Sequence, residues 1–256
     1  MFTKAIVRTP GKNFAEGITS SGLGAPDLGK TLEQHAAYVR ALESCGLAVT
    51  VLDPDLEFPD STFVEDTAVM VGKLAVLARP GAESRMGEVN AIRGAIEATG
   101  KQVVEITAPG TLDGGDICEA DDHFFIGISQ RTNQDGGRQL AESIKSAGYT
   151  SSFVDIREMR GILHLKSGIA HLGDKDMVLW DEFAGFEQFR GYDLIRVLPE
   201  ERYASNCVSV NDVVLVADGF PMFVQQIERA GYKPLMLDVS EFRKMDGGLS
   251  CLSIRF

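Results

Sequence analysis

Apolar residues along the chain recur in an order that predicts two short strands, a helix and a third strand. The first clear copy has two apolar runs within Glu65–Pro80, separated by a polar turn at Gly72–Lys73. An amphipathic stretch, Met86–Thr99, and a further apolar run, Gln102–Ile106, complete the copy. The predicted order of elements in one unit is therefore strand, strand, helix, strand.

Three further copies of this unit follow without a linker. Their polar turns fall at Asp121–Asp122, Gly173–Asp176 and Asn211–Asp212. Their middle segments are Asn133–Ala147, Phe183–Arg190 and Pro221–Ala230. Their last strands are predicted at Thr150–Ile156, Asp193–Val197 and Pro234–Asp238. Self-similarity at a spacing of roughly 40–50 residues is typical of repeat architectures.

A fifth unit is divided between the two ends of the chain. Gly248–Phe256 supplies one strand, while Lys4–Pro10, a helix over Leu28–Ser44 and a strand over Ala48–Leu52 supply the rest. Pairing of the two ends would close a ring and remove exposed sheet edges. The predicted fold class is α/β, a five-bladed αβ-propeller of ββαβ units that forms one domain over residues 1–256. A plain α/β or α+β domain with hairpins is the alternative.

Composition and charge narrow the class of protein. A chain with 44% hydrophobic and 24% charged residues is typical of a globular protein. Its formal net charge of −12 disfavours nucleic acid as a partner and is compatible with a cationic small substrate. No apolar stretch approaches the roughly 20 residues of a membrane span, and Met1–Pro10 lacks the apolar centre of a signal peptide. We therefore expect a cytoplasmic protein without a membrane partner, and the oligomeric state stays open, with a homodimer as one option.

The four cysteines are widely spaced, so neither a disulfide framework nor a structural metal site is expected. Cys45 lies at the end of the first predicted helix, and Cys118 and Cys207 lie in apolar strands, so we expect all three in the core. Cys251 follows two glycines near the end of the sequence, where the backbone can bend and a substrate can approach. It is either a small apolar residue of a terminal strand or a nucleophile.

The four histidines differ in their predicted settings. His35 lies in a predicted surface helix, His123 at a hairpin turn and His171 late in a strand, and each setting favours a structural role. His164 stands between apolar residues at the start of a hairpin. If the hairpin openings of all units converge in the ring, Cys251, His164 and a carboxylate meet there. Those three groups are what covalent catalysis requires.

Carboxylates gather at two of the hairpin openings and nearby. They are Asp60, Glu65, Asp66, Asp113 and Asp116. Like charges packed together raise one another's pKa unless a cation lies between them, and a planar guanidinium with five donors suits two carboxylates. A solvated acidic rim or a divalent-metal site is the alternative. Arg85 and Arg131 lie in turns and offer two forks for a carboxylate, so the acidic and basic groups would bind opposite ends of an amino acid.

Seven segments, in chain order, resemble dimethylarginine dimethylaminohydrolase, a family of the guanidine-modifying superfamily. They are FPDSTFVEDTAVM, RPGAESR, TLDGGDI, GISQRTNQ, LHLKSG, SNCVSVN and KMDGGLSCLS. The resemblance covers essentially the whole chain. It implies a five-unit αβ-propeller with no cofactor and no metal. It also implies hydrolysis of N-omega-methylated L-arginine, namely asymmetric dimethylarginine or monomethylarginine, to L-citrulline and dimethylamine or methylamine through a covalent cysteine intermediate.

The resemblance also implies roles for single residues. Cys251 would be the nucleophile, His164 the general acid and base, and Asp113 the carboxylate that orients the imidazole. The implied substrate-binding positions are Ile18, Asp60, Glu65, Asp66, Arg85, Arg131, Met245 and Asp246. Among them, Asp66 and Glu65 would hold the guanidinium, the two arginines the α-carboxylate, and the others the α-amino end. The loop Gly11–Gly24 corresponds to the mobile lid of the family, and the chain departs from some members in having Asp at position 113 and Ile at position 18.

Two other functions stay open at the level of sequence. One is arginine deiminase or amidinotransferase activity on another guanidino compound. Short turns between the units argue against this activity, because the members of those families carry inserted segments. The other is a non-catalytic propeller that binds an amino acid, since fold alone does not determine function.

Overall fold

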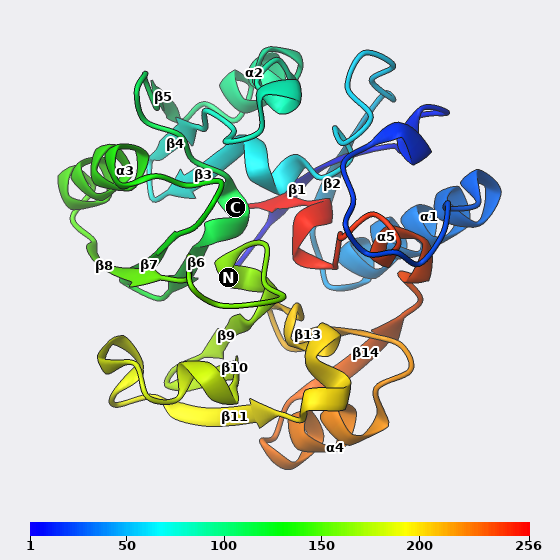
Figure 1. Ribbon diagram of the computed structural model, residues 1–256, viewed down its shortest axis with the longest axis vertical. Helices are drawn as coiled ribbons and strands as arrows, with labels where there is room; N and C mark the ends of the chain where they lie inside the picture. Colours follow the sequence, from blue (N-terminus) through cyan, green and yellow to red (C-terminus); the bar gives the residue numbers. More distant parts are fainter.

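The computed structural model describes residues 1–256 and contains five three-stranded sheets placed around a common centre (Figure 1). One sheet contains β1 (Lys4–Arg8) and β2 (Ala48–Leu52) together with the last strand of the chain. The next contains β3 (Ala68–Val71), β4 (Leu74–Leu77) and β5 (Gln102–Glu105). The next two use β6 (Ile117–Ala120), β7 (His123–Ile128), β8 (Thr150–Asp155), β9 (Ile169–Gly173), β10 (Asp176–Trp180) and β11 (Asp193–Val197). The remaining strands are β12 (Val208–Val210), β13 (Val213–Ala217), β14 (Lys233–Leu237) and β15 (Ile254–Arg255).

All five sheets share one topology. The middle strand pairs antiparallel with the strand nearest the centre and parallel with the outer strand. In the fifth sheet the inner strand is β15 from the C-terminal end, and it pairs with β1 through Ala5–Arg255 and Ile6–Ile254. The two ends of the chain therefore close the ring, as the sequence predicts, and the fold is the expected five-unit αβ-propeller.

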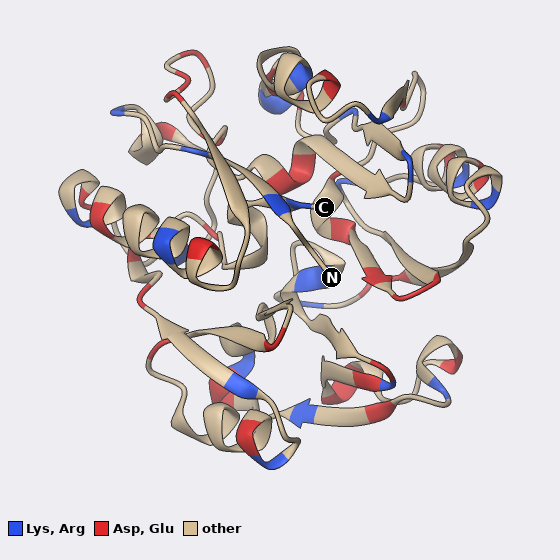
Figure 2. Cartoon of the chain, turned by 180° about the vertical axis from the view of Figure 1, so that it is seen from behind, with Lys and Arg blue, Asp and Glu red and all other residues tan.

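Helices cover the outside of the ring (Figure 1). They are α1 (Leu28–Ser44), α2 (Glu88–Glu97), α3 (Gln134–Ser146) and α4 (Pro221–Arg229), while the short α5 (Ser240–Arg243) lies on the inner side of α1. Asp27 caps α1 by accepting a hydrogen bond from the Lys30 main-chain nitrogen, and Asn133 caps α3 in the same way. Positions of both charge signs, Lys and Arg as well as Asp and Glu, are distributed over the helices (Figure 2). None of the helices combines the length and apolar character that crossing a bilayer requires.

Each inner strand is preceded by a short 3-10 helix. These helices are Val64–Thr67, Gly114–Asp116, Leu165–Ser167, Pro199–Ser205 and Ser250–Leu252. They lie next to one another around the ring and contact each other. Because the residues at the hairpin openings belong to these turns or adjoin them, the fold brings the sequence-predicted site residues to one end of the ring.

The third unit and His35 differ from the sequence-based expectation. Where the other units have an α-helix, the third has two 3-10 helices, Asp181–Phe183 and Glu187–Phe189, with Gly185 between them. Glycine weakens a helix, and Phe183 and Phe189 become buried without a continuous one.

His35 lies on the inward side of α1 and is only 4% exposed, so its assignment to the surface was wrong. Burial lowers its pKa to about 4, and it is therefore neutral.

Candidate active site

A cavity of about 390 Å³ opens at the end of the ring that carries the 3-10 helices. Its wall contains both Cys251 and His164, the proposed nucleophile and the proposed acid and base. Glu65 and Asp246, two of the sequence-predicted binding residues, also line it. The structure thus places the Cys251 thiol and the His164 imidazole on the wall of the same open cavity.

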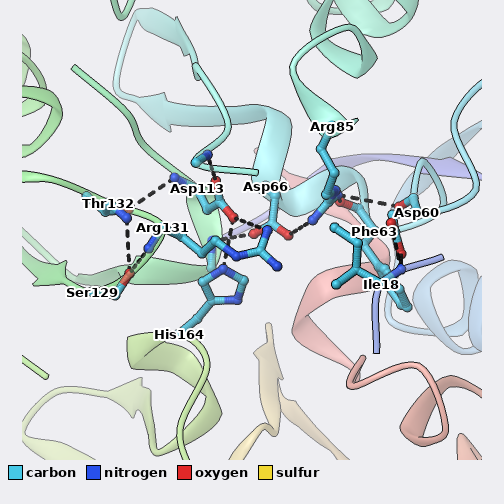
Figure 3. Close-up of polar contacts among 12 residues, drawn as sticks. Ile18, Asp60, Phe63, Asp66, Arg85, Asp113, Ser129, Arg131, Thr132 and His164 are labelled. Carbon is cyan, nitrogen blue, oxygen red and sulfur yellow. Dashed lines mark hydrogen bonds and ion pairs between the residues drawn. The ribbon is translucent and has the colours of Figure 1, made fainter. Parts of the chain in front are cut away.

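A hydrogen bond from His164 to Asp113 determines the orientation of the imidazole. Nε2 of His164 lies 3.0 Å from Oδ2 of Asp113, which is completely buried. The other carboxylate oxygen accepts a hydrogen bond of 2.8 Å from the Gly81 main-chain nitrogen. Nη1 of Arg131 lies 3.7 Å from Oδ2 and has no hydrogen-bond partner in the protein. Asp113 is thus held from several sides while it holds the histidine (Figure 3).

The pKa of His164 reflects two opposing effects. Burial alone would lower it, but the nearby carboxylates of Asp66, Asp113 and Asp116 outweigh burial and raise it to about 9. The imidazole is therefore protonated at neutral pH and can act as an acid. Asp116 contributes structurally as well, since it accepts hydrogen bonds from Ser129 Oγ at 2.6 Å and from the Leu165 main-chain nitrogen at 3.0 Å.

Cys251 lies in the 3-10 helix Ser250–Leu252 and is half-buried. Burial raises the pKa of its thiol to about 12, and the negative charges of Glu65 and Asp66 add to the effect. The other cysteines are also free thiols, with Cys118 and Cys207 buried as expected and Cys45 half-buried against the core. The resting site therefore combines a thiol with an imidazolium, and a further positive charge is needed to form the thiolate.

Asp66 bonds to an arginine of the protein itself. Nη1 of Arg85 donates a hydrogen bond of 2.6 Å to Asp66, and its Nε and Nη2 donate to the two oxygens of Glu88 at 2.9 and 2.8 Å. All three side chains are buried. Figure 3 shows Asp66 between Arg85 on one side and His164, Asp113 and Arg131 on the other. Part of the acidic cluster is therefore neutralised internally, which the sequence-based interpretation did not anticipate.

Glu65 likewise has partners within the protein. Its Oε1 accepts from Lys166 Nζ at 2.6 Å and lies 3.5 Å from Arg255 Nη2, and its Oε2 accepts from Ser250 Oγ at 2.8 Å. Glu65, Lys166 and Ser250 line the cavity and also a second cavity of about 550 Å³ along the ring axis. This ion pair therefore forms the floor between the two spaces.

The segment Gly11–Gly24 contributes Ser21 and Leu23 to the wall of the cavity. The main-chain nitrogen of Ile18 donates to both oxygens of Asp60, at 3.2 and 3.1 Å. The main-chain nitrogen of Ser20 donates to Oδ2 of Asp246 at 2.5 Å. Met245 is buried, whereas the Ile18 side chain is 44% exposed. The bonds from Ile18 to Asp60 and from Ser20 to Asp246 thus attach the segment Gly11–Gly24 to the rest of the chain beside the cavity.

Asp66, Asp113 and His164 place three ligand atoms within 4.8 Å of one another, the spacing of a metal site. Their oxygens and nitrogen already bind Arg85, the Gly115 and Gly81 main-chain nitrogens, and each other. Two arginine side chains also lie beside the cluster. The positive charge of these arginines opposes a divalent cation, so the donor set fits a proton-transfer site better than a metal site.

Several residues of the site were missed from the sequence. They are Glu88, Lys166, Asn206 and Ser250. Each acts through a partner that is distant in sequence, apart from Glu88, which lies three residues from Arg85. An acidic residue one helical turn after an arginine was the one local signal available.

The chain is similar to known proteins over most or all of its length. The family model described as N,N dimethylarginine dimethylhydrolase, eukaryotic, matches residues 27–186. The N(G),N(G)-dimethylarginine dimethylaminohydrolase of Pseudomonas aeruginosa is 44% identical over 257 residues, covering 100% of both chains. The enzyme of the same name from Streptomyces coelicolor is 35% identical, covering 98% of this chain and 96% of its own.

Solved structures extend the likeness to three dimensions. A Cys-to-Ser mutant of the Pseudomonas aeruginosa enzyme complexed with citrulline has a TM-score of 0.96, 43% identity and full coverage of both chains. A His-to-Gly variant of dimethylarginine dimethylaminohydrolase, as an adduct with S-methyl-L-thiocitrulline, also has a TM-score of 0.96 and 43% identity over the full length of both. The N-terminal domain of ArgZ, a cyanobacterial arginine dihydrolase, shares the fold with a TM-score of 0.88 at 19% identity, covering 100% of this chain and 97% of its own.

A five-sheet αβ-propeller with a cysteine and a carboxylate-bound histidine in one cavity defines a protein of the guanidine-modifying class. The chain belongs to the dimethylarginine dimethylaminohydrolase family, and it is a hydrolase of that family. This membership decides against the arginine deiminase and amidinotransferase alternatives and against a non-catalytic propeller.

Proposed function

We propose that the protein hydrolyses N-omega-methylated L-arginine to L-citrulline and dimethylamine or methylamine, with Cys251 as the nucleophile and His164 as acid and base. The observation that carries the assignment is the shared cavity of Cys251 and His164, with His164 held by Asp113 at 3.0 Å. The citrulline complex and the thiocitrulline adduct of the relatives support this choice of substrate class. In those structures the substituted residues are a cysteine and a histidine, which are the two residue types assigned the chemistry here.

Substrate binding follows from the charges around the cavity. The guanidinium would lie near Asp66 and Glu65, whose negative charges are close enough to raise the pKa of the Cys251 thiol. Arg131, whose Nη1 has no hydrogen-bond partner in the protein, would bind the α-carboxylate. Arg85 would assist Arg131 in binding the α-carboxylate while it keeps its own bonds to Asp66 and Glu88. The α-amino end would bind near Ile18, Asp60, Met245 and Asp246, beside the segment Gly11–Gly24.

The first chemical step needs a thiolate, and the bound substrate supplies the charge that favours it. A guanidinium about 4 Å from the sulfur, at an effective dielectric constant of about 20, contributes roughly 4 kcal/mol. This energy corresponds to about three pKa units. A thiol whose pKa is about 12 in the free protein would then titrate near pH 9, so a reactive fraction exists at neutral pH.

The thiolate of Cys251 adds to the guanidinium carbon, and protonated His164 donates its proton to the departing amine nitrogen as the C–N bond breaks. The products of this step are an S-alkylthiouronium adduct of Cys251, the free amine and a neutral imidazole. The imidazole then takes a proton from water, and the resulting hydroxide adds to the same carbon. Breaking of the C–S bond, with transfer of the hydroxyl proton of the adduct to the departing sulfur, releases citrulline and returns Cys251 as a thiol. The raised pKa of His164 suits the first step, because the acid is already charged at neutral pH.

The partner in this reaction is a small molecule, and we take residues 1–256 as one catalytic unit in the cytoplasm. Four free thiols fit a reducing compartment. The acidic net charge fits a cationic substrate and not a nucleic acid.

The assignment is tested by incubating the purified protein separately with asymmetric dimethylarginine, monomethylarginine and arginine, and measuring citrulline, methylated amine and ammonia. We expect citrulline and the corresponding amine in equal amounts from the methylated substrates, and much slower release of ammonia from arginine. Ammonia from arginine as the faster reaction, or no citrulline from any of the three, would contradict the proposal.

A further inference from the structure

The side chain of Asn206 joins the two segments that carry the proposed nucleophile and base. Asn206 ends the 3-10 helix Pro199–Ser205, and its side chain lies between Leu165–Ser167 and Ser250–Leu252. The first of these segments begins directly after His164, and the second contains Cys251. Asn206 lines the catalytic cavity and is only 8% exposed.

Both ends of the Asn206 amide are used in this connection. Oδ1 accepts a hydrogen bond of 2.9 Å from the Ser250 main-chain nitrogen. Nδ2 donates to Ser250 Oγ at 3.0 Å and to the Lys166 main-chain oxygen at 2.9 Å. A β-carbon built on Gly248 would lie 2.4 Å from Oδ1, so the chain before Cys251 passes directly against this amide. The position therefore requires a side chain that both donates and accepts.

These bonds form a closed circuit with Glu65. Ser250 Oγ donates to one oxygen of Glu65 at 2.8 Å, and Lys166 Nζ donates to the other at 2.6 Å. The main-chain oxygen of Lys166 accepts a hydrogen bond from Nδ2 of Asn206, and the same nitrogen donates to Ser250 Oγ, which completes the circuit. Four side chains from four segments of the ring thus hold one another in place, immediately beside Cys251 on one side and His164 on the other.

We propose that Asn206 is a positioning residue for the reaction, which fixes the distance and angle between the Cys251 sulfur and the His164 imidazole. This inference rests on the proposed function. Asn206 makes no hydrogen bond to either group, so its effect is transmitted through Ser250 and Lys166. A displacement of about 1 Å between reacting groups can cost about 100-fold in rate. The segments Leu165–Ser167 and Ser250–Leu252 are far apart in the sequence, and the side-chain amide of Asn206 bridges them through hydrogen bonds.

The test replaces the amide by a carboxylate of the same shape. Asn206→Asp keeps the acceptor for the Ser250 nitrogen but loses both donated hydrogen bonds at neutral pH. We expect kcat with asymmetric dimethylarginine to fall about 10- to 100-fold, with KM changed by less than about threefold. The introduced carboxyl lies beside Glu65, which raises its pKa, and its protonated form regains one donor. The kcat of Asn206→Asp relative to wild type should therefore rise as the pH is lowered from 8 to 6.

Asn211→Asp provides a matched control. Its side chain also makes three hydrogen bonds to main-chain groups distant in sequence, with Phe2 N and with the carbonyl oxygens of Phe2 and Cys45. It lies in the turn between β12 and β13, and its φ of 54° is one that Asp also tolerates. We expect Asn211→Asp to lower the melting temperature while kcat stays within twofold of wild type.

The outcomes separate this inference from the proposed function. If wild-type protein produces no citrulline, the proposed function itself fails. If wild type is active and Asn206→Asp retains kcat within twofold, or loses no more activity than Asn211→Asp, the positioning role is overturned. A loss that acts on KM instead of kcat, or that does not recover at low pH, also contradicts it. Should Asn206→Asp prove too unstable, Asn206→Ser, which retains one donor, is expected to show an intermediate kcat, and a wild-type kcat in that variant would overturn the role.

Discussion

The protonation states of Cys251 and His164 decide what the resting protein can do. Burial and two nearby carboxylates raise the pKa of the Cys251 thiol, whereas three carboxylates overcome the effect of burial and raise the pKa of His164. The resting pair is therefore a thiol, which is a poor nucleophile, and an imidazolium, which can donate a proton but cannot accept one. Only a cation placed between the acidic groups and the sulfur changes this balance, which links ionisation of the nucleophile to the presence of substrate.

This balance predicts how fast Cys251 reacts with iodoacetamide. In a Cys45→Ser background, which removes the other half-buried thiol, alkylation of the free protein should be slow. Its rate should keep rising up to pH 9, because the thiol pKa lies above that range. An unreactive guanidinium ligand small enough to leave the sulfur accessible should increase the rate at pH 7. Peptide mass spectrometry measures this rate, and equal rates with and without the ligand would show that ionisation does not depend on substrate charge.

Single site residues could be predicted from the sequence where the residue type has few common roles, as for cysteine and histidine. They could not be predicted where the role depends on the direction of the side chain. Cys251 and His164 were brought together because both stand at hairpin openings, and the structure places them in one cavity. Lys166 was indistinguishable from a surface lysine in the sequence, and its bond to Glu65 spans 101 positions. The sequence-based interpretation placed the guanidinium of the substrate between the carboxylates. The structure shows that the guanidinium of Arg85, a residue of the protein itself, already binds Asp66.

Short 3-10 helices are the elements that bring the site together. They begin the inner strands of all five sheets, so each sheet contributes one turn to the same end of the ring. The alternation of apolar residues predicted the strands and the helix Leu28–Ser44 well, because period and length distinguish them. The tight turns themselves were not predicted as helices, because four of the five have only three or four residues, which carry too little periodicity. The absence of an α-helix in the third unit was likewise hidden, since Phe183–Arg190 is apolar enough to suggest one.

The turn Gly114–Asp116 depends on the absence of a side chain at Gly115. A β-carbon there would lie 2.8 Å from Asp66 Oδ1 and 2.9 Å from two atoms of the His164 ring. We expect Gly115→Ala to displace the imidazole and lower kcat by about 100-fold. Gly94→Ala on the exposed face of α2 is the matched control, because a β-carbon there meets open space. It should keep kcat and raise the free energy of unfolding by up to about 1 kcal/mol, and equal kcat values for the two variants would disprove the steric account.

At the scale of the whole molecule, the closure of the ring positions the nucleophile. Strand β15 pairs with β1, and Cys251 precedes this strand by three residues. The sequence predicted the closure because the two ends together complete one unit of the repeat. It did not reveal that a floor formed by Glu65 and Lys166 divides the ring axis into two cavities, because this division depends on side chains from different sheets.

Ring closure predicts an effect of Ile254 on activity as well as on stability. Ile254 is 4% exposed and packs in the same apolar cluster as Ile96, which is fully buried in α2. Alanine at either position should lower the free energy of unfolding by about 2–5 kcal/mol. Ile254→Ala should also lower the kcat of the folded protein, because the segment with Cys251 loses its anchor, while Ile96→Ala should not. Urea unfolding and steady-state kinetics check both values, and an unchanged kcat in Ile254→Ala would separate ring closure from catalysis.

The central claim is that Cys251 forms a covalent intermediate that His164 helps to resolve, and trapping this adduct tests it most directly. We would incubate His164→Gly protein with S-methyl-L-thiocitrulline, quench with acid and locate the adduct by peptide mass spectrometry, with Cys251→Ser in the same His164→Gly background as the control. The account predicts one adduct per chain, on the peptide that contains Cys251, and none in the control. An adduct on another cysteine, or the same adduct in the control, would contradict the account.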